Sequence, residues 1–399
     1  MESTFHPPIR NSFFTLPHHQ RVSFKPATFL KKHSNLHIYN MTTHRAVATV
    51  GIKAPLDIIS VPTITPQADQ VRIRVQWTAS TPLDLHQNDG GLLVKHPQVL
   101  GDGIAGTVVE VGPDVKRLKV GEKVFGFGWR KNEEKAHQEF VTIEEWLVGV
   151  LPEGFTLQQA VTLPNNFVTV FHAVTADLGL ELPWPKPNSF APNQKDEVIL
   201  VWGGASSVGQ FAIQILAYYG YANIFTTASE RHHEKLRAMG AKHIFDYNDA
   251  DVIASISQTA QGSVPLVVDC IGSLKGSLTP LAKIATKGSK VAVLLPIIVK
   301  DSSESEDPEY AIDVETIVDW EEGVIAKGVR THYYLENEFF KNHLQADIMP
   351  AMLEQGIVKP NAQKIIEGDT LLERAQKAMD ALRRKEASME RLVWRVSEI

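Results

Sequence analysis

Apolar and polar positions divide the chain into two parts with different periods. Between about residues 45 and 150 the apolar residues form short runs, and 71–75 alternates apolar with polar as a half-buried strand does. The stretches 106–112 and 119–126 predict two further strands, each beside a turn, and glycine and proline interrupt the region often. This pattern predicts a mostly antiparallel β domain.

The pattern changes near residue 157, where a helix-like run extends to 178, and from 197 onward strands and helices alternate. Buried strands are predicted at 197–202, 222–227, 244–246, 266–270 and 290–295, and helices at 206–219 and 231–239. Alternating units of this length predict a parallel sheet with helices on both faces. We interpret the acidic insertion at 301–309 as a solvated loop. The tail from about 335 is interpreted as one or two helices and a strand at 392–396.

The first forty residues have a composition of their own, with one acidic residue, Glu2, and five basic ones. They show no sustained helical or strand period, so residues 1–41 are left out of the fold prediction. Three interpretations stay open: an untranslated leader before a start at Met41, an import segment that is basic and poor in acid, and an unstructured tail. We expect a cytoplasmic location, or a mitochondrial one if this segment directs import.

Composition excludes several classes of protein. Of the 399 residues, 43% are hydrophobic and 22% are charged, which is typical of a globular chain and not of a disordered one. The single cysteine, Cys270, excludes internal disulfides and zinc sites built from several cysteines. The net charge of -6 argues against a broad nucleic-acid-binding surface. Because apolar runs fall short of the roughly 18–20 residues that span a bilayer, we expect no membrane partner, and the charge argues against a nucleic-acid partner. Whether the protein is a monomer or a homodimer stays open.

The most informative segment is 201–209, a glycine-rich turn between a predicted strand and a predicted helix. Gly203 and Gly204 permit a tight turn, and Gly209 lets the helix pack against the strand. Ser206 replaces the middle glycine of the dinucleotide fingerprint, but its small side chain still lets a pyrophosphate approach the backbone N–H groups at the helix start. The candidate cofactor-binding residues of this turn are Gly203, Gly204, Ser206, Ser207, Val208 and Gly209. A purely structural turn is the alternative.

The end of the following strand distinguishes the two nicotinamide cofactors. NAD-binding sites usually carry an acidic residue there, which accepts hydrogen bonds from the ribose 2′-hydroxyl. In this chain Ser229 can donate to a 2′-phosphate, Arg231 can pair with it, and Tyr247 could add a hydroxyl. Glu230 is evidence for NAD, unless it is a solvent-facing acid at a helix start. We favour NADPH over NADH.

Five stretches together resemble the medium-chain dehydrogenase/reductase superfamily, and most of all its zinc-free quinone oxidoreductase and fungal trans-enoyl reductase branch. They are 100–112, 119–126, 203–209, 239–247 and 268–272. The resemblance implies an α/β fold in which a Rossmann-type parallel-sheet nucleotide domain is inserted into a GroES-like, mostly antiparallel β domain. It implies three segments: a first catalytic part at 42–170, the nucleotide domain at 171–330 with an acidic loop at 300–310, and a return to the catalytic domain at 331–399.

The same resemblance implies that the cofactor lies in the cleft between the two domains. Cys270 and Gly272 would then lie near its edge, as further candidate cofactor-binding residues. Because Cys270 follows a predicted strand, we interpret its side chain as a small buried packing group and not as a nucleophile.

Zinc-dependent members of the superfamily carry a Gly-His-Glu motif and an early cysteine as metal ligands. This chain reads Gly-Asp-Gly at 101–103 and has no cysteine within 80–86. Asp84, His86 and Asp102 could in principle bind a metal, but scattered histidines and acids are more often surface or hydrogen-bonded residues. We expect no metal. Without a Lewis acid, a polarised acceptor such as an enone or a quinone fits better than a plain alcohol.

Two residues are candidates for catalysis. His86 lies where related enoyl reductases often carry lysine, and it could donate a hydrogen bond to a substrate carbonyl or to ribose hydroxyls; the alternative is a histidine packed at the cleft rim. Thr169 falls where the family places a threonine near the nicotinamide, unless its hydroxyl only bonds its own helix. Asp84 is expected to fix its loop. Three aromatic residues could line an apolar pocket or belong to the core: Trp129, Phe167 and Phe171.

The leading hypothesis is a zinc-independent, NADPH-dependent reductase of an activated double bond or a quinone. Hydride would reach the acceptor, and protein donors would stabilise the oxygen that becomes negative. The branch implies fungal secondary metabolism and a substrate that is either a small molecule or bound to a carrier protein. Two alternatives stay open: a zinc-type alcohol dehydrogenase, and a protein that binds NADPH without catalysis.

Overall fold

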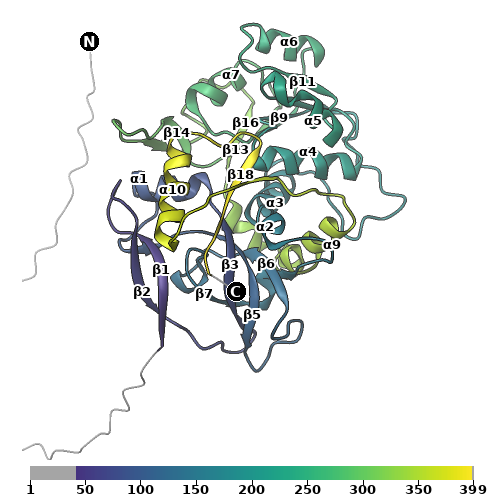
Figure 1. Ribbon diagram of the computed structural model, residues 1–399. Coiled ribbons are helices and arrows are strands. Elements are labelled where there is room, and N and C mark those ends of the chain that lie inside the picture. Colours follow the sequence, from purple (N-terminus) through teal and green to yellow (C-terminus); the bar gives the residue numbers. More distant parts are fainter. Residues whose placement is uncertain (1–41, 398–399) are drawn as a thin grey trace, which may run out of the picture. The chain divides into compact units, whose positions relative to one another are not determined.

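The computed structural model describes residues 42–397, so the hypotheses on residues 1–41 lie outside the described residues. Within that range, one sheet of seven strands and one of six carry the architecture (Figure 1). A three-stranded sheet accompanies them, with β1 (Thr43–Thr49) between β2 (Asp57–Pro62) and β4 (Gln98–Val99), and all its pairs are antiparallel.

The seven-stranded sheet is antiparallel apart from the pair β17 and β18. Its strands lie in the order β17-β18-β3-β5-β6-β8, and β7 pairs with β3. They are β3 (Gln70–Ala79), β5 (Gly103–Val111), β6 (Lys123–Phe127), β7 (Phe140–Glu144), β8 (Val148–Val150), β17 (Ala362–Ile365) and β18 (Glu390–Arg395). Val71, Ile73 and Val75 of β3 are fully buried, which confirms the predicted alternation. Because β18 pairs with β3, the C-terminal segment of the described chain returns to the sheet that contains β3 and β5 to β8.

The six-stranded sheet is parallel throughout, as predicted. Its order is β11-β10-β9-β12-β13-β16. The strands are β9 (Ile199–Trp202), β10 (Ile224–Thr227), β11 (His243–Phe245), β12 (Leu266–Asp269), β13 (Lys290–Leu294) and β16 (Ile325–Val329). From β9 the chain proceeds to one side and then returns to the other at β12. Ligands of such sheets bind at the carboxyl ends of the two strands where the order reverses.

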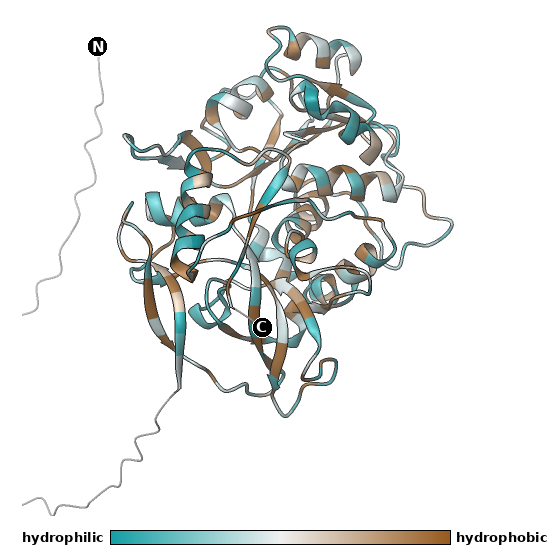
Figure 2. Ribbon diagram, viewed as in Figure 1, coloured by the Kyte–Doolittle hydropathy of each residue, from teal (hydrophilic) through white to brown (hydrophobic). Residues whose placement is uncertain are grey.

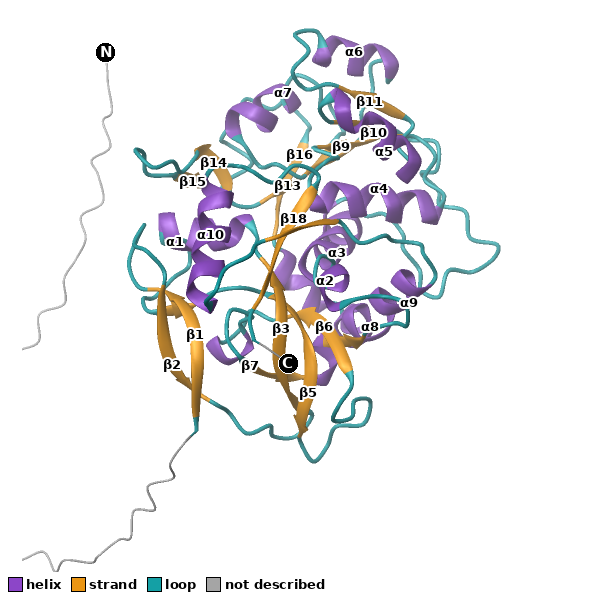
Figure 3. Ribbon diagram, viewed as in Figure 1, coloured by secondary structure: helices purple, strands orange, loops and turns teal. Residues whose placement is uncertain are grey.

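Helices cover this sheet and connect it to the other one (Figure 3). Those of the parallel sheet are α4 (Ser207–Tyr219), α5 (His233–Met239), α6 (Val252–Thr259) and α7 (Thr279–Leu281). Those of the remaining chain are α1 (Pro82–Gly90), α2 (Leu157–Ala160), α3 (Pro164–His172), α8 (Glu338–His343), α9 (Met349–Glu354) and α10 (Leu371–Arg383). In Figure 2 α5 is mainly hydrophilic, in keeping with Leu236 as its one buried residue. A shared core joins the two sheets, with Phe127 of β6, Phe167 of α3 and Phe211 of α4 among its members.

Four predicted elements differ in detail. The described part of the tail, from about 335, has three helices, α8 to α10, and two strands, β17 and β18, where one or two helices and one strand were expected. The helix-like run at 157–178 is divided into α2, α3 and a wide turn (Ala173–Asp177), because Pro164 lacks an N–H group and begins α3. The helix predicted from 231 begins at His233, after a 3-10 turn. The acidic insertion is the tip of an unpredicted hairpin, β14 (Ile297–Lys300) and β15 (Glu309–Ala311). Its acidic residues are mostly exposed, but the interpretation as a solvated loop is wrong for Ser302, which is buried.

Candidate active site

The glycine turn lies between β9 and α4, at the edge where the strand order reverses. Gly203 adopts a φ of +87°, and a Cβ atom at Gly204 would lie 2.1 Å from Thr226 Oγ1. A Cβ at Gly209 would lie 2.4 Å from the carbonyl oxygen of Gly203. The Ser206 hydroxyl accepts a hydrogen bond from the Gly209 N–H group at 3.0 Å and so caps α4. These residues form a backbone-lined cradle at a helix start, which fits a pyrophosphate.

The side chains of Ser207 and Val208 contact other parts of the protein. The Ser207 hydroxyl hydrogen-bonds the side chain of Asn361, which belongs to the segment leading into β17. Val208 is 7% exposed and belongs to the shared core. The predicted cofactor residues Ser207 and Val208 therefore also anchor the turn to the protein, and their backbone N–H groups are the part that a phosphate would meet.

The end of β12 forms the other wall of the cradle. Gly272 has a φ of +61°, and a Cβ there would lie 2.4 Å from the Leu294 carbonyl oxygen. The buried Asp269 carboxylate accepts hydrogen bonds from the N–H groups of Ile271 and Gly272, at 2.9 and 3.1 Å. Cys270 is partly buried and packs against the shared core. Burial raises the pKa of its thiol, so this side chain stays protonated near pH 7.

The residues expected at the 2′-phosphate separate into two groups. The hydroxyl oxygens of Ser229 and Tyr247 lie 3.0 Å apart. They meet because β10 and β11 are neighbours in the sheet. Arg231, in contrast, donates to Ser388 Oγ at 2.7 Å and to His232 Nε2 at 3.2 Å. Sequence reasoning missed Ser388 and His232, whose own side chains lie 2.9 Å apart. The hydroxyls of Ser229 and Tyr247 can donate to a phosphate monoester, whereas Arg231 is bonded to Ser388 and His232.

His86 lies on α1 and is bound by the hairpin. Its Nδ1 atom is 2.8 Å from the Tyr310 hydroxyl, and the two rings meet edge to face with centroids 4.8 Å apart. Burial lowers the pKa of His86 to about 4 and raises the pKa of Tyr310, so both groups are neutral near pH 7. A phenol is a better donor than acceptor, so we assign its proton to the Nδ1 contact. Nε2 then carries the ring proton and is a donor.

Tyr310→Phe is expected to lower kcat/KM about fivefold, because it removes a hydrogen bond of about 1 kcal/mol that selects the His86 tautomer. KM for the cofactor should stay within twofold. Steady-state kinetics would measure both, with Tyr218→Phe as a matched control on α4. Equal kcat/KM values for Tyr310→Phe and the control would show that the hairpin does not position His86.

Thr169 links α3 to the segment after β16. Its hydroxyl is 2.9 Å from the Asn165 carbonyl oxygen and 3.0 Å from Thr331 Oγ1. The Asn165 amide in turn donates to Asp102 Oδ2 at 2.5 Å. The Thr169 hydroxyl therefore donates to its own helix, which was the alternative interpretation from the sequence. It also contacts Thr331, in the segment that follows β16 of the parallel sheet.

Among the hydrogen bonds that connect the carboxyl edge of the parallel sheet to the rest of the chain are those of Ser207, Tyr310 and Thr331. Ser207, after β9, reaches Asn361. Tyr310, after β13, reaches His86. Thr331, after β16, reaches Thr169. His86 and Thr169, both predicted as catalytic, thus meet the edge that carries the glycine turn.

The predicted apolar pocket is not formed by the phenylalanines. Phe167 and Phe171 are fully buried in the shared core. Trp129 is half-buried and lies against Phe127 and His332, with ring centroids 4.3 and 5.1 Å away. Trp129 and the exposed His332 therefore form an aromatic pair that is not enclosed in the core.

A group of buried charges lies around Asp102, which Asn165 joins to the helix of Thr169. Asp84 accepts hydrogen bonds from the Thr81 and Gly101 N–H groups, at 2.8 and 3.0 Å, and fixes its loop as expected. Burial raises the pKa of Asp102 to about 6. Sequence reasoning missed two buried cations of this group, Lys135 and Arg391, each 7% exposed. Lys135 gave no signal because it stands in a charged segment, 131–135, and lysines of such segments are usually on the surface.

Two further features of the described chain concern metal binding and membrane insertion. Within residues 42–397 no group of three or more His, Cys, Asp or Glu side chains could hold a metal ion. In the same range no helix is both long and apolar enough to cross a membrane.

Comparisons with known proteins agree with this geometry. Residues 67–173 match the alcohol dehydrogenase GroES-like domain, and residues 207–296 match the family described as zinc-binding dehydrogenase. The chain is 29% identical to the dehydrogenase pigH of Monascus ruber over 349 residues, which are 81% of this chain and 92% of that one. It is 34% identical to the trans-enoyl reductase himH of Aspergillus japonicus over 209 residues, 51% of this chain and 59% of that one. The crystal structure of the CurK enoyl reductase superposes with a TM-score of 0.67 at 19% identity, covering 88% of this chain and 98% of that one.

The fold and the matched families define an oxidoreductase with a GroES-like β domain and a Rossmann-type domain, of a kind whose members bind a nicotinamide cofactor. The chain belongs to the medium-chain dehydrogenase/reductase superfamily. Its enoyl reductase relatives support an enzyme that acts on double bonds.

Proposed function

We propose that this protein reduces, with NADPH and without zinc, a carbon–carbon double bond conjugated to a carbonyl group. A quinone is the second acceptor that the same chemistry allows. The observation that carries the proposal is that His86 and Thr169 are hydrogen-bonded to segments that follow strands of the parallel sheet, at the edge that also carries the glycine turn. Similarity to a trans-enoyl reductase of Aspergillus japonicus supports the double bond as the acceptor.

The residues present fit NADPH as the bound cofactor. The turn of Gly203, Gly204 and Gly209 would hold the pyrophosphate, and the hydroxyls of Ser229 and Tyr247 would hold the 2′-phosphate. When bound, this cofactor supplies the hydride. The exposed Glu230 would then face solvent.

The chain's own residues would hold the acceptor and its developing charge. His86 Nε2 is a neutral donor that can bind a carbonyl oxygen or a ribose hydroxyl. Thr169 can share its hydroxyl with a carboxamide while it bonds Asn165. The side chains near this edge include hydrogen-bond donors such as Asn165 and Lys135, which are not zinc ligands. They are better suited to bind the oxygen of a substrate than to bind a metal ion.

The remaining expectations complete the proposal. The substrate is a small molecule or an acyl chain on a carrier protein, and the protein acts as a monomer or homodimer in the cytoplasm. The similarity to fungal dehydrogenases supports a role in secondary metabolism.

The proposal is tested by following NADPH consumption with a 2-enoyl thioester and a small para-quinone in parallel. We expect turnover of the thioester to its saturated product, at least about tenfold faster with NADPH than with NADH. Turnover of the quinone alone would make the protein a quinone reductase. Stoichiometric zinc in the pure protein would overturn zinc independence. Tight NADPH binding without turnover of any acceptor would favour a binding protein.

A further inference from the structure

Lys135 lies near Asp102, in a position held by backbone hydrogen bonds. It follows the 3-10 turn Asn132–Glu134. The N–H groups of Ala136 and His137 donate to the carbonyl oxygens of Gly101 and Leu100, each at 3.0 Å. These two bonds hold residue 135 beside the segment of Gly101 and Asp102.

The Lys135 side chain is buried among charged groups. Burial lowers its pKa, and the nearby carboxylates of Asp102, Asp84 and Glu134 act in the opposite direction. Its charge also lowers the pKa of His332, behind the larger effect of desolvation. Since His332 follows β16, Lys135 lies where the antiparallel sheet meets the carboxyl edge of the parallel one.

The Lys135 ammonium group nevertheless forms no ion pair with a carboxylate of the described residues. Among the described residues no carboxylate oxygen lies within 4 Å of Lys135 Nζ, and no hydrogen bond to it is present, whereas Arg383 and Arg130 each have such partners. Asp102 Oδ1 is buried and also has no hydrogen-bond partner in the described part of the chain. A lysine that only balanced the charge of Asp102 would contact it. The ammonium protons are therefore available to another acceptor.

That acceptor must be compatible with the neighbouring groups. Asn165 joins Asp102 to α3, and one turn further Thr169 contacts Thr331. Lys135 thus lies near Asp102, which Asn165 joins to α3, and Thr169 joins the same helix to the segment that carries His332. His86 is a neutral donor held by Tyr310, and the Thr169 hydroxyl is a neutral donor that bonds its own backbone. A cationic ammonium group stabilises a full negative charge better than either neutral donor does.

We infer that Lys135 is a catalytic residue whose ammonium binds the carbonyl oxygen of the acceptor and stabilises the negative charge that develops on it. The inference rests on the proposed function. Hydride adds to the β-carbon, the electron pair of the double bond shifts so that the carbonyl oxygen becomes an enolate, and a proton from water then completes the α-carbon. Lys135 is neither oxidised nor reduced and keeps its protons overall.

Lys135→Met should lower kcat about a hundredfold, as loss of one preorganised donor to an oxyanion does. Its affinity for NADPH, measured by fluorescence titration, should change less than threefold. Lys135→Arg should retain part of the activity, because a cation remains. The double variant Asp102→Asn with Lys135→Met removes one charge of each sign; it should fold as well as the wild type and still be slow. Activity of either Met variant within threefold of the wild type would overturn the inference.

A second readout does not depend on turnover. The visible absorbance of 4-nitrophenol reports its ionisation, and a cation at its oxygen favours the phenolate. We expect saturating wild-type protein to lower the apparent pKa of bound nitrophenol, and Lys135→Met to abolish that shift. An equal shift in both proteins would overturn the role of Lys135. If the wild type reduces no acceptor but still shifts nitrophenol through Lys135, the proposed function fails and the anion site stands.

Discussion

Gly209→Ala is expected to weaken NADPH binding at least about a hundredfold and to destabilise the protein by about 2 kcal/mol. A Cβ at this position would lie 2.4 Å from the Gly203 carbonyl oxygen and 2.8 Å from Gly204 Cα. Alanine in a helix would otherwise gain up to about 1 kcal/mol over glycine. The clash outweighs this gain, because both neighbours are backbone atoms and the start of α4 must move away from the turn.

The measurement combines NADPH titration with urea unfolding. Gly51→Ala is the matched control, since its Cβ would meet only the Ala54 methyl group, at an ordinary 3.5 Å. The control should bind NADPH as the wild type does. If Gly209→Ala bound NADPH within threefold of the control, the turn would not be the pyrophosphate site.

The turn could be predicted from sequence because its constraints are local. Gly203, Gly204 and Gly209 are within seven positions of one another, and the strand and helix around them show their own periods. The Ser229–Tyr247 contact could be anticipated as well, since each residue follows one of two adjacent parallel strands. The alternation of β and α units was sufficient for the fold class.

Other parts of the site depend on contacts between distant residues, which the periodicity of apolar residues in the sequence does not reveal. Tyr310 and His86 are 224 positions apart, and Arg231 and Ser388 are 157 apart. The hairpin that carries Tyr310 was interpreted as a loop because its strands are short and its tip is acidic. Lys135 was overlooked for a related reason, since burial of a lysine follows from tertiary packing and not from its neighbours in sequence.

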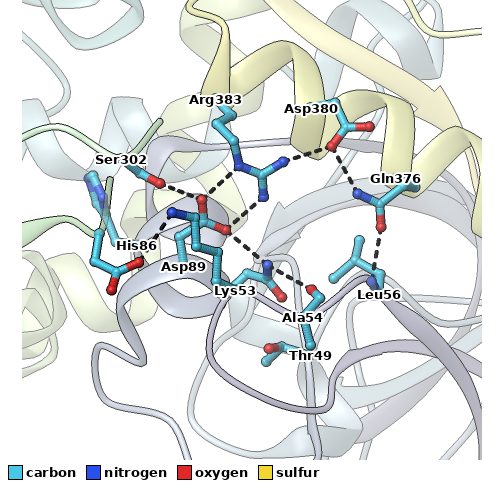
Figure 4. A network of polar contacts seen from close by, with 12 residues as sticks. Thr49, Lys53, Ala54, Leu56, His86, Asp89, Ser302, Gln376, Asp380 and Arg383 are labelled. Carbon is cyan, nitrogen blue, oxygen red and sulfur yellow. Dashed lines mark hydrogen bonds and ion pairs between the residues drawn. The ribbon is translucent and has the colours of Figure 1, made fainter. Parts of the chain in front are cut away.

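A polar network around Asp89 holds that hairpin and α10 against α1 (Figure 4). Asp89, at 0% exposure, receives two hydrogen bonds from the Arg383 guanidinium, at 2.7 and 2.8 Å. Ser302, at the base of the acidic tip, donates to the same carboxylate at 2.5 Å. Arg383 also bonds Asp380 at 2.8 Å. Through Ser302 this network contributes to the position of the segment that carries Tyr310.

Burial acts to raise the pKa of Asp89, but hydrogen bonds from Arg383, Ser302 and Asn88 outweigh it, and the net pKa is lowered. In the wild type this carboxylate therefore stabilises the fold above its unfolded pKa, near 3.8, and the contribution is lost as pH falls through the lower folded pKa. Without Arg383 the effect of burial is opposed less. The folded pKa of Asp89 then rises, and protonation relieves the buried charge as the pH falls.

Arg383→Met is therefore expected to cost about 3–5 kcal/mol at pH 7, because it leaves a buried carboxylate without its cation, and clearly less at pH 5. Urea unfolding at both pH values would measure the difference. Arg384→Met is the control, since Arg384 pairs with Glu386 while about half-exposed and such pairs contribute about 0–1 kcal/mol. Adding Asp89→Asn to Arg383→Met should restore part of the loss, because the unpaired charge is gone. A cost equal to that of the control, or equal at the two pH values, would mean that Arg383 does not neutralise Asp89 and that other contacts hold the hairpin at His86.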